Sequence, residues 1–313
     1  GATDRLGKVA DGNTVLDFDA EEKRRKSSVS SAMAAIEWDN TKLNIIDAPG
    51  LFDFENGSAE AVRAAEAVLI VTSAGSGVDV GTEKAFKAAE KRGLAKFFAI
   101  TKTDSDHRSF YKTFEALKEV YGNKLCPTII PYMEGNITKS YVNLMTGMAY
   151  EYDENGKATK VPMPNDPVIE EMTSAFMEAV ATTDDELMEK FFEGETFTPD
   201  EILKGLCTGI FDGSIYPVYA VAGLTCAGVD QLLYNLAWSV PGAYGYAGET
   251  AKNEAGEDVV LPCDINGPLA AVCFKTVADP FVGKMSFFKV VSGKLAPDTQ
   301  AYNVRTGETE KMG

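Results

Sequence analysis

Along the first 240 residues, short apolar runs alternate with longer stretches in which apolar residues recur every three or four positions. The runs are bounded by polar residues or glycine and predict buried strands at AVLIVTS (67–73), KFFAIT (96–101), PTIIPY (127–132) and IYPVYAV (215–221). The amphipathic stretches predict helices over 58–66, 82–93, 109–122, 199–208 and 228–240. Strands that alternate with helices of this length predict βαβ units and a largely parallel sheet.

Two segments depart from this rhythm. Residues 33–38 and 42–47 predict a pair of strands joined by a turn at Asp39-Asn40. Between about 135 and 200 the alternation stops, and the sequence predicts a hairpin around Asn155-Gly156 followed by helices over 167–180 and 184–192. We therefore expect an α+β insertion subdomain at 135–200 within an α/β domain that covers residues 1–240.

The pattern changes again after Pro241. Residues 241–265 are rich in Gly, Glu, Asp and Asn and predict a linker or exposed loops. Residues 266–313 alternate apolar and polar positions with glycine at the turns, which predicts antiparallel strands of an all-β domain. A segment of this length is too short to close a barrel, so an incomplete barrel is expected.

Composition and charge narrow the function classes. Hydrophobic residues make up 45% and charged residues 25%, as in ordinary globular proteins, and no apolar run is long enough to cross a bilayer. The net charge of −17 argues against nucleic-acid binding through a broad basic face, and it leaves a local basic patch open. The five cysteines form no CxxC pair and the single histidine is His107, so a zinc site and a His-based triad are disfavoured. An odd number of scattered cysteines suits a reducing cytoplasm.

The first candidate motif is DAPG at 47–50, where the strand 42–47 ends. A carboxylate at the carboxyl end of a strand in an α/β sheet faces the crevice where ligands bind. In nucleotide triphosphatases an Asp at this place holds Mg²⁺, and the Gly that follows offers its N–H to the γ-phosphate. Taken alone, the segment is explained equally well as a plain strand-to-turn connection.

The second candidate motif is TKTD at 101–104, after the strand 96–101. A carboxylate can accept hydrogen bonds from both the N1–H and the exocyclic amine of guanine, and the stem of a lysine can lie along the base. Taken alone, this motif is weak, because Asp104 also suits the N-cap of the next helix. The two motifs in this order form a much stronger signal than either one.

Together, DAPG and TKTD resemble the DxxG and NKxD motifs of the translational GTPases, most closely those of elongation factor G and its paralogues. The resemblance continues in the same order through 4–32, 186–206 and 268–299. It implies a fold of the P-loop-GTPase type, in which helices cover both faces of a largely parallel sheet. It also implies an α+β insertion subdomain and the start of an all-β barrel, domain II of that family.

The resemblance also implies roles around the phosphates. Ser28 stands where the family has a switch I Thr that coordinates Mg²⁺, and Asp47 is expected to hold Mg²⁺ through water. Gly50 is expected to sense the γ-phosphate. Leu51 occupies the position of a His that orients the attacking water, and a leucine cannot form that hydrogen bond. Catalysis at Leu51 is therefore expected to be impaired.

Around the base, Lys102 is expected to pack on guanine and Asp104 to read it. Thr101 replaces the Asn of NKxD. Ala222 and Gly223 stand where the family has Ser-Ala, whose backbone N–H meets the guanine O6, a contact that Gly223 can still make. The replacements at Thr101 and Ala222 are expected to weaken guanine binding modestly, by about 0.5–1.5 kcal/mol for each hydrogen bond lost.

No GxxxxGK[ST] occurs in the 313 residues, and the first residue is Gly rather than Met. We therefore expect a fragment of a GTPase domain without its P-loop, and weak GTP binding by this chain alone. The expected ligands of the parent protein are GTP or GDP and Mg²⁺.

The predicted function is that of a cytoplasmic translation factor of the elongation factor G type, which couples GTP hydrolysis to movement on the ribosome. The expected partner is the ribosome, contacted through local patches such as the basic residues 23–26, with no membrane and no DNA. A ribosome-binding paralogue with little GTPase activity, or an inactive fragment, is the alternative.

Overall fold

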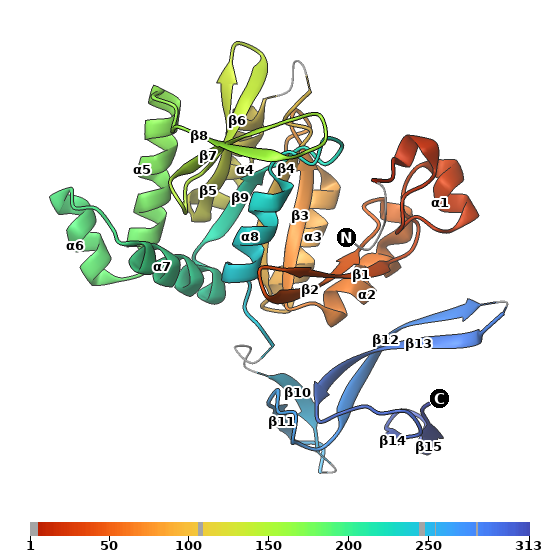
Figure 1. Ribbon diagram of the computed structural model, residues 1–313. Coiled ribbons are helices and arrows are strands. Elements are labelled where there is room, and N and C mark those ends of the chain that lie inside the picture. Colours follow the sequence, from red (N-terminus) through yellow and green to blue (C-terminus); the bar gives the residue numbers. More distant parts are fainter. Residues whose placement is uncertain (1–5, 106–108, 244–247, 254, 280) are drawn as a thin grey trace. The chain divides into compact units, whose positions relative to one another are not determined.

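The computed structural model describes residues 6–105, 109–243, 248–253, 255–279 and 281–313. Its contacts divide the chain into two units, residues 1–240 and 241–313. The first unit is built on a seven-stranded sheet (Figure 1). In spatial order its strands are β3 (Ala67–Ser73), β4 (Ala95–Thr101), β9 (Tyr216–Ala220), β5 (Leu125–Glu134), β6 (Ile137–Asn143), β7 (Met148–Tyr152) and β8 (Ala158–Val161).

The sheet has a parallel half and an antiparallel half. The strands β3, β4, β9 and β5 pair in parallel, whereas β6, β7 and β8 extend the sheet beyond β5 as antiparallel neighbours. The parallel half is the predicted βαβ core, and the antiparallel half comes from the predicted insertion. The insertion strands therefore continue the main sheet instead of forming a separate one.

Helices cover both faces of the sheet (Figure 1). The helices α3 (Val80–Lys91) and α4 (Phe110–Tyr121) lie on one face, and α7 (Pro199–Asp212) and α8 (Val229–Ser239) lie on the other. The strand β4, next to the edge strand β3, is buried along nearly its whole length, with Phe97, Phe98 and Ile100 inaccessible to solvent. The predicted α/β class, with its largely parallel sheet between two helical layers, is confirmed.

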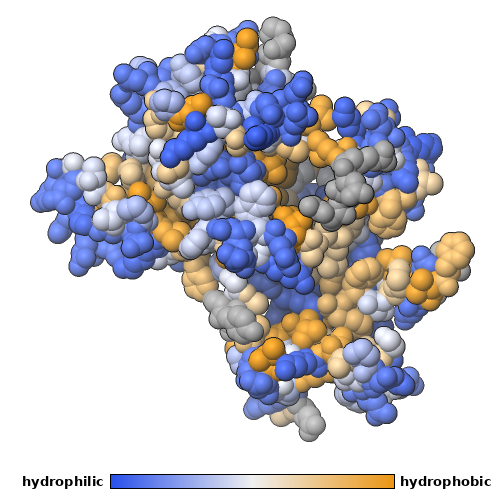
Figure 2. All heavy atoms as spheres, viewed as in Figure 1, coloured by the Kyte–Doolittle hydropathy of each residue, from blue (hydrophilic) through white to orange (hydrophobic). Residues whose placement is uncertain are grey.

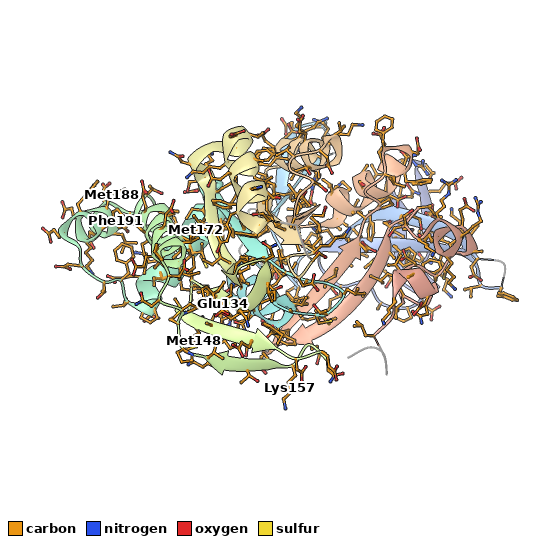
Figure 3. All side chains as sticks on the ribbon, turned by 90° about the horizontal axis from the view of Figure 1, so that it is seen from above. Glu134, Met148, Lys157, Met172, Met188 and Phe191 are labelled. Carbon is orange, nitrogen blue, oxygen red and sulfur yellow. The ribbon has the colours of Figure 1, made fainter. Side chains whose placement is uncertain are left out.

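The insertion carries two further helices, α5 (Pro167–Ala181) and α6 (Asp185–Glu193). Each is preceded by an aspartate, Asp166 or Asp184, whose side chain accepts a backbone hydrogen bond from the first turn. Figure 3 shows Met172, Met188 and Phe191 on this pair of helices, and Glu134 and Met148 on the neighbouring strands.

The strands β1 (Ala32–Trp38) and β2 (Thr41–Asp47) form a separate antiparallel pair. Asp39 and Asn40, which join them, both have positive φ, as a tight two-residue hairpin turn requires. Asp39 also accepts a hydrogen bond of 2.8 Å from the indole N–H of Trp238 in α8. Next to this pair lie the short helix α1 (Ala20–Arg25) and the helix α2 (Glu55–Ala64).

The second unit consists of three antiparallel hairpins. They pair β10 (Glu249–Lys252) with β11 (Asp258–Leu261), β12 (Ala270–Asp279) with β13 (Gly283–Ser292), and β14 (Gln300–Asn303) with β15 (Glu308–Lys311). The first hairpin lies in the stretch 241–265, which the sequence predicts as a linker or loops, so that expectation is corrected. Alternation in four-residue strands is too short a signal to stand out from glycine-rich loops. The barrel assignment of residues 266–313 stays a prediction.

Candidate functional site

Two of the predicted motif loops meet at the carboxyl ends of neighbouring strands. The parallel pairing of β4 with β9 joins Phe98 to Val218 and Ile100 to Ala220, so both strands end at the same edge of the sheet. The loop 101–105 follows β4 and the loop 221–228 follows β9. The carboxyl edge of a parallel sheet is where α/β folds bind ligands, so the topology alone places these two loops at a candidate site.

Direct contacts join the two loops. The hydroxyl of Thr225 donates a hydrogen bond of 3.0 Å to a carboxylate oxygen of Asp104. A Cβ atom added at Gly223 would lie 3.9 Å from the hydroxyl of Thr101. Thr225 was not predicted from the sequence, because a threonine in a glycine- and alanine-rich loop carries no local signal of its partner. The structure thus places Thr101 beside Gly223 and Asp104 beside Thr225, and the roles that the resemblance implies for them stay predictions.

The backbone of the loop 221–228 distinguishes its two predicted residues. The N–H of Ala222 donates to the carbonyl of Ala227 at 2.9 Å, and Ala222 is fully buried. This amide is therefore already engaged within the loop. Of Ala222 and Gly223, only Gly223 is therefore suited to offer its backbone N–H to a ligand. That role of Gly223 stays a prediction.

Lys102 has an unusual backbone. Its φ of 60° lies in the left-handed region, which costs a residue with a Cβ about 1–2 kcal/mol. The loop alternates in exposure, since Lys102 and Asp104 are exposed whereas Thr103 between them is buried. The backbone thus presents one ammonium and one carboxylate to solvent at the sheet edge. These are the two side chains predicted to meet the base.

A second cluster gathers around Asp47 at the end of β2. The hydroxyl of Ser28 lies 3.5 Å from a carboxylate oxygen of Asp47 and donates at 3.0 Å to Asp17. Burial raises the pKa of Asp47, and the nearby carboxylate of Asp17 raises it further, while the hydrogen bond from Ser28 acts in the opposite direction. Two carboxylates and a hydroxyl are the oxygen donors that Mg²⁺ prefers, so this set fits that ion.

Asp17 and Glu22 were both missed at the sequence level. Glu22 is only 1% exposed, and its carboxylate accepts the backbone N–H groups of Val29 and Ser30 at 3.1 and 3.2 Å. It also accepts the N–H of Asp19 at 3.1 Å, which completes a capping box at the start of α1. The spacing Asp19-x-x-Glu22 is a capping signal that could have identified it within the charged run. Glu22 thereby fixes the backbone that follows Ser28.

The turn after Asp47 is held from α2. The hydroxyl of Ser58 donates to the carbonyl of Pro49 at 2.7 Å, and a Cβ atom on Gly57 would lie 2.8 Å from the Pro49 ring. A Cβ atom on Gly50 would meet nothing within 4 Å, so packing does not require a glycine there. Leu51 is 49% exposed, and its side chain therefore contributes little to the core. The roles predicted for Gly50 and Leu51 stay predictions.

Other features of the structure lie away from these clusters. A cavity of about 450 Å³ in the insertion is lined by apolar and polar residues of α5 and of the segment 191–197, and it includes none of the predicted site residues. Figure 2 shows mostly hydrophilic residues over the adjoining helix α6. All five cysteines are free. Among the described residues, no three His, Cys, Asp or Glu side chains are grouped as for a metal ion, and no helix is long and apolar enough to span a membrane. His107 lies outside the described residues.

Comparisons with known proteins agree with this fold. The profile of the family described as elongation factor Tu GTP binding domain matches residues 1–241. The elongation factor G-like protein of Mycobacterium tuberculosis, in strains CDC 1551 / Oshkosh and ATCC 25618 / H37Rv, is 31% identical over 302 residues. That match covers 95% of this chain and 42% of the relative.

A crystal structure of a protein from Thermus thermophilus shares the fold, with a TM-score of 0.83 and 28% identity. The match covers 99% of this chain and 44% of that one. The chain thus spans less than half the length of these relatives.

The α/β fold, the loops at its strand ends and the family match define a GTP-binding domain. More narrowly, the chain belongs to the translational GTPase family and is of the elongation factor G-like type. This confirms the family predicted from DAPG and TKTD. The roles of the individual residues are taken up as proposals below.

Proposed function

We propose that the chain is the guanine-nucleotide-binding part of a ribosome-dependent translation factor that couples GTP hydrolysis to movement on the ribosome. The observation that carries this proposal is the joining of Asp104 and Thr225 across the two loops at the ends of β4 and β9. One oxygen of Asp104 is held by the Thr225 hydroxyl, which orients the carboxylate toward a planar ligand at the sheet edge. The family match supports the same conclusion.

In this proposal the residues of the two loops divide the recognition of guanine. Asp104 accepts hydrogen bonds from the N1–H and the exocyclic amine, a pair of donors that adenine does not present. The stem of Lys102 lies along the base, and the N–H of Gly223 meets O6. Thr101 contributes a hydroxyl where an amide would make more contacts, so modest affinity is expected.

In the same proposal, the cluster around Asp47 binds the phosphates and their metal ion. Ser28 and Asp47 would hold Mg²⁺, and the carboxylate of Asp17, which accepts a hydrogen bond from Ser28, could join them. A bound Mg²⁺ supplies charge neutralisation for the phosphates. A cation held there would also offset the repulsion from Asp17, which adds to burial in raising the pKa of Asp47. Gly50 offers its backbone N–H to the γ-phosphate.

A second function is favoured by one specific observation. Leu51 is half exposed beside the DAPG turn and has no group that can orient a water molecule. A factor with this residue binds the ribosome and guanine nucleotide but hydrolyses GTP slowly. The two functions share the binding site and differ only in the rate of the chemical step.

Two measurements on the full-length protein test these proposals. A titration with GDP and ADP is expected to show binding of GDP only, and equal binding of both would contradict the proposed reading of the base. Single-turnover GTP hydrolysis with and without ribosomes then separates the two functions. Strong stimulation by ribosomes supports the hydrolysing factor, whereas ribosome binding without stimulation supports the slow paralogue.

A further inference from the structure

The strand β6 and the turn between β7 and β8 of the insertion contact the two loops that are proposed to read guanine. Tyr141 of β6 is 3% exposed, and its hydroxyl lies 2.9 Å from the hydroxyl of Thr103. Thr138 of β6 donates at 2.7 Å to the carbonyl of Thr103. The residue that precedes Asp104 is therefore held by the insertion through both its side chain and its backbone.

The direction of the bond between Tyr141 and Thr103 follows from counting protons. The Thr103 hydroxyl also lies 3.0 Å from the carbonyl of Val221, which can only accept. Thr103 therefore donates its single proton to Val221, and Tyr141 must donate to Thr103. Burial raises the pKa of Tyr141 to about 12, so this proton is present at physiological pH. The chain of hydrogen bonds runs from β6 through the loop 101–105 into the loop 221–228.

The ring of Tyr141 makes a second connection. A Cβ atom added at Gly228, the residue before α8, would lie 3.2 Å from the Tyr141 ring and 2.8 Å from the carbonyl of Ala220. Gly228 has a φ of 77°, so it is suited to both the conformation and the close approach. One side chain of the insertion thus touches both loops, through its hydroxyl on one side and its ring on the other.

Two further contacts of the insertion lie at the loop 221–228 and at the start of the helix α8 that follows it. The hydroxyl of Tyr152 donates to the carboxylate of Asp230 in the first turn of α8. Gly156, in the turn between β7 and β8, packs so closely that an added Cβ would lie 2.7 Å from the carbonyl of Thr225. Figure 3 shows the side chain of the adjacent Lys157 pointing away from the molecule. The turn therefore contacts Thr225 through Gly156 and not through the Lys157 side chain.

We infer that Tyr141 is a specificity-determining positioning residue, through which the insertion strands fix the Asp104 carboxylate for recognition of the guanine amine. The inference rests on the proposed guanine-binding function and deepens it. Tyr141 itself touches no base in this arrangement. It acts by holding Thr103 against Val221, which fixes Asp104 relative to Thr225 and Gly223.

The test compares dissociation constants for GDP and for inosine diphosphate, which lacks the exocyclic amine, in the full-length protein. Tyr141→Phe and Thr103→Val are each expected to reduce the preference for GDP by about three- to tenfold, the effect of one weakened hydrogen bond. Thr103→Ser keeps the hydroxyl and is expected to retain the preference. Tyr111→Phe is the matched control, because its hydroxyl donates at 2.6 Å to Pro131 and touches neither loop.

A ratio of dissociation constants does not change when a variant merely lowers the folded fraction, so the readout separates positioning from stability. Equal weakening of both nucleotides, or no change, in Tyr141→Phe and Thr103→Val overturns the inference while the proposed function stands. If the wild-type protein shows no preference for GDP, the proposed reading of guanine fails, and this inference fails with it.

A second pair of variants tests the same inference from the turn before β8. Gly156→Ala pushes a methyl group against Thr225 and Cys226, whereas Gly147→Ala, at a similar positive φ of 63°, meets nothing within 4 Å. Both variants carry the same kind of backbone strain. Only Gly156→Ala is expected to reduce the preference for GDP over inosine diphosphate, and equal effects of the two would count against the inference.

Discussion

The two proposed functions differ in the rate of GTP hydrolysis, and Leu51 is the residue that distinguishes them. Its side chain is 49% exposed beside the DAPG turn, so a substitution there disturbs little packing. The neighbouring Pro49 is fixed by Ser58 and Gly57, which means that the turn itself keeps its place when residue 51 changes. Under the proposed function, the chemistry of one exposed side chain decides between fast and slow hydrolysis, without any change in the fold.

Leu51→His is expected to raise ribosome-stimulated GTP hydrolysis in the full-length protein by about tenfold or more, because an imidazole can orient the attacking water. Single-turnover hydrolysis with ribosomes measures the effect. Leu51→Ala is the control, since it removes the leucine without adding a hydrogen-bonding group. A Leu51→His variant no faster than Leu51→Ala would show that this position does not limit the rate.

At the scale of elements, the most unusual buried group in the sheet is Lys96 of β4. It is only 7% exposed, and its ammonium lies 5.5 Å from the Phe86 ring of α3 and 5.3 Å from the Tyr216 ring of β9. It donates a single hydrogen bond of 3.2 Å to the carbonyl of Leu94. Burial lowers the pKa of Lys96, opposed by the attraction of Glu90 and assisted by the charge of Lys124.

Lys96→Met is expected to raise the free energy of unfolding by about 1 kcal/mol at pH 7, because it removes a buried charge and keeps the volume of the side chain. The pKa of Lys96 is lower in the folded protein than its ordinary value of 10.5. At pH values between these two, Lys96 holds its proton more tightly in the unfolded chain than in the folded protein. The stability of the wild-type protein relative to Lys96→Met therefore rises with pH across that window.

Denaturant unfolding at pH 7 and pH 10 measures the stability difference between Lys96→Met and the wild type. The control for the loss of one positive charge is Lys118→Met, at an exposed lysine of α4 that is not among the groups that shift the pKa of Lys96. If the free energies of unfolding of Lys96→Met and the wild type differed by the same amount at both pH values, burial would not lower the pKa of Lys96 as argued.

At the scale of the whole molecule, the net charge of −17 opposes general attraction to RNA. The proposed ribosome contact is therefore local. In the basic run 23–26, Glu21 forms ion pairs with Arg24 and Arg25, and these pairs lower the pKa of Glu21 to about 2. The charges of Lys23 and Lys26 are consequently the better candidates for contact with RNA phosphates.

The double variant Lys23→Glu/Lys26→Glu is expected to weaken ribosome-stimulated GTP hydrolysis, with a larger loss at low salt, and to leave GDP affinity unchanged. Lys118→Glu, on the exposed side of α4, is the control for added negative charge. Hydrolysis rates over a range of ribosome concentrations and two salt concentrations measure the effect. Equal losses in the control and the double variant would show that only bulk charge matters.

The elements and the family could be predicted from sequence because their signals are local. Apolar runs such as 96–101 and amphipathic stretches such as 109–122 show the periodicity of their own secondary structure, and DAPG and TKTD are contiguous motifs. The hairpin of β10 and β11 was missed, since strands of four residues carry too little periodicity. Thr225, Asp17 and Glu22 were missed because their partners are distant in sequence or hidden in a charged run.

By itself, the sequence determined the strand-helix alternation, the insertion at 135–200 and the positions of the motifs, since each depends on residues close together in the chain. Only the tertiary structure decided that β6, β7 and β8 extend the main sheet, and that Tyr141 reaches Thr103 and Gly228. For Tyr141 the physical reason is that its contacts join residues 38 or more positions apart in the chain. Strand order and packing bring them together, and neither leaves a periodic trace in the sequence.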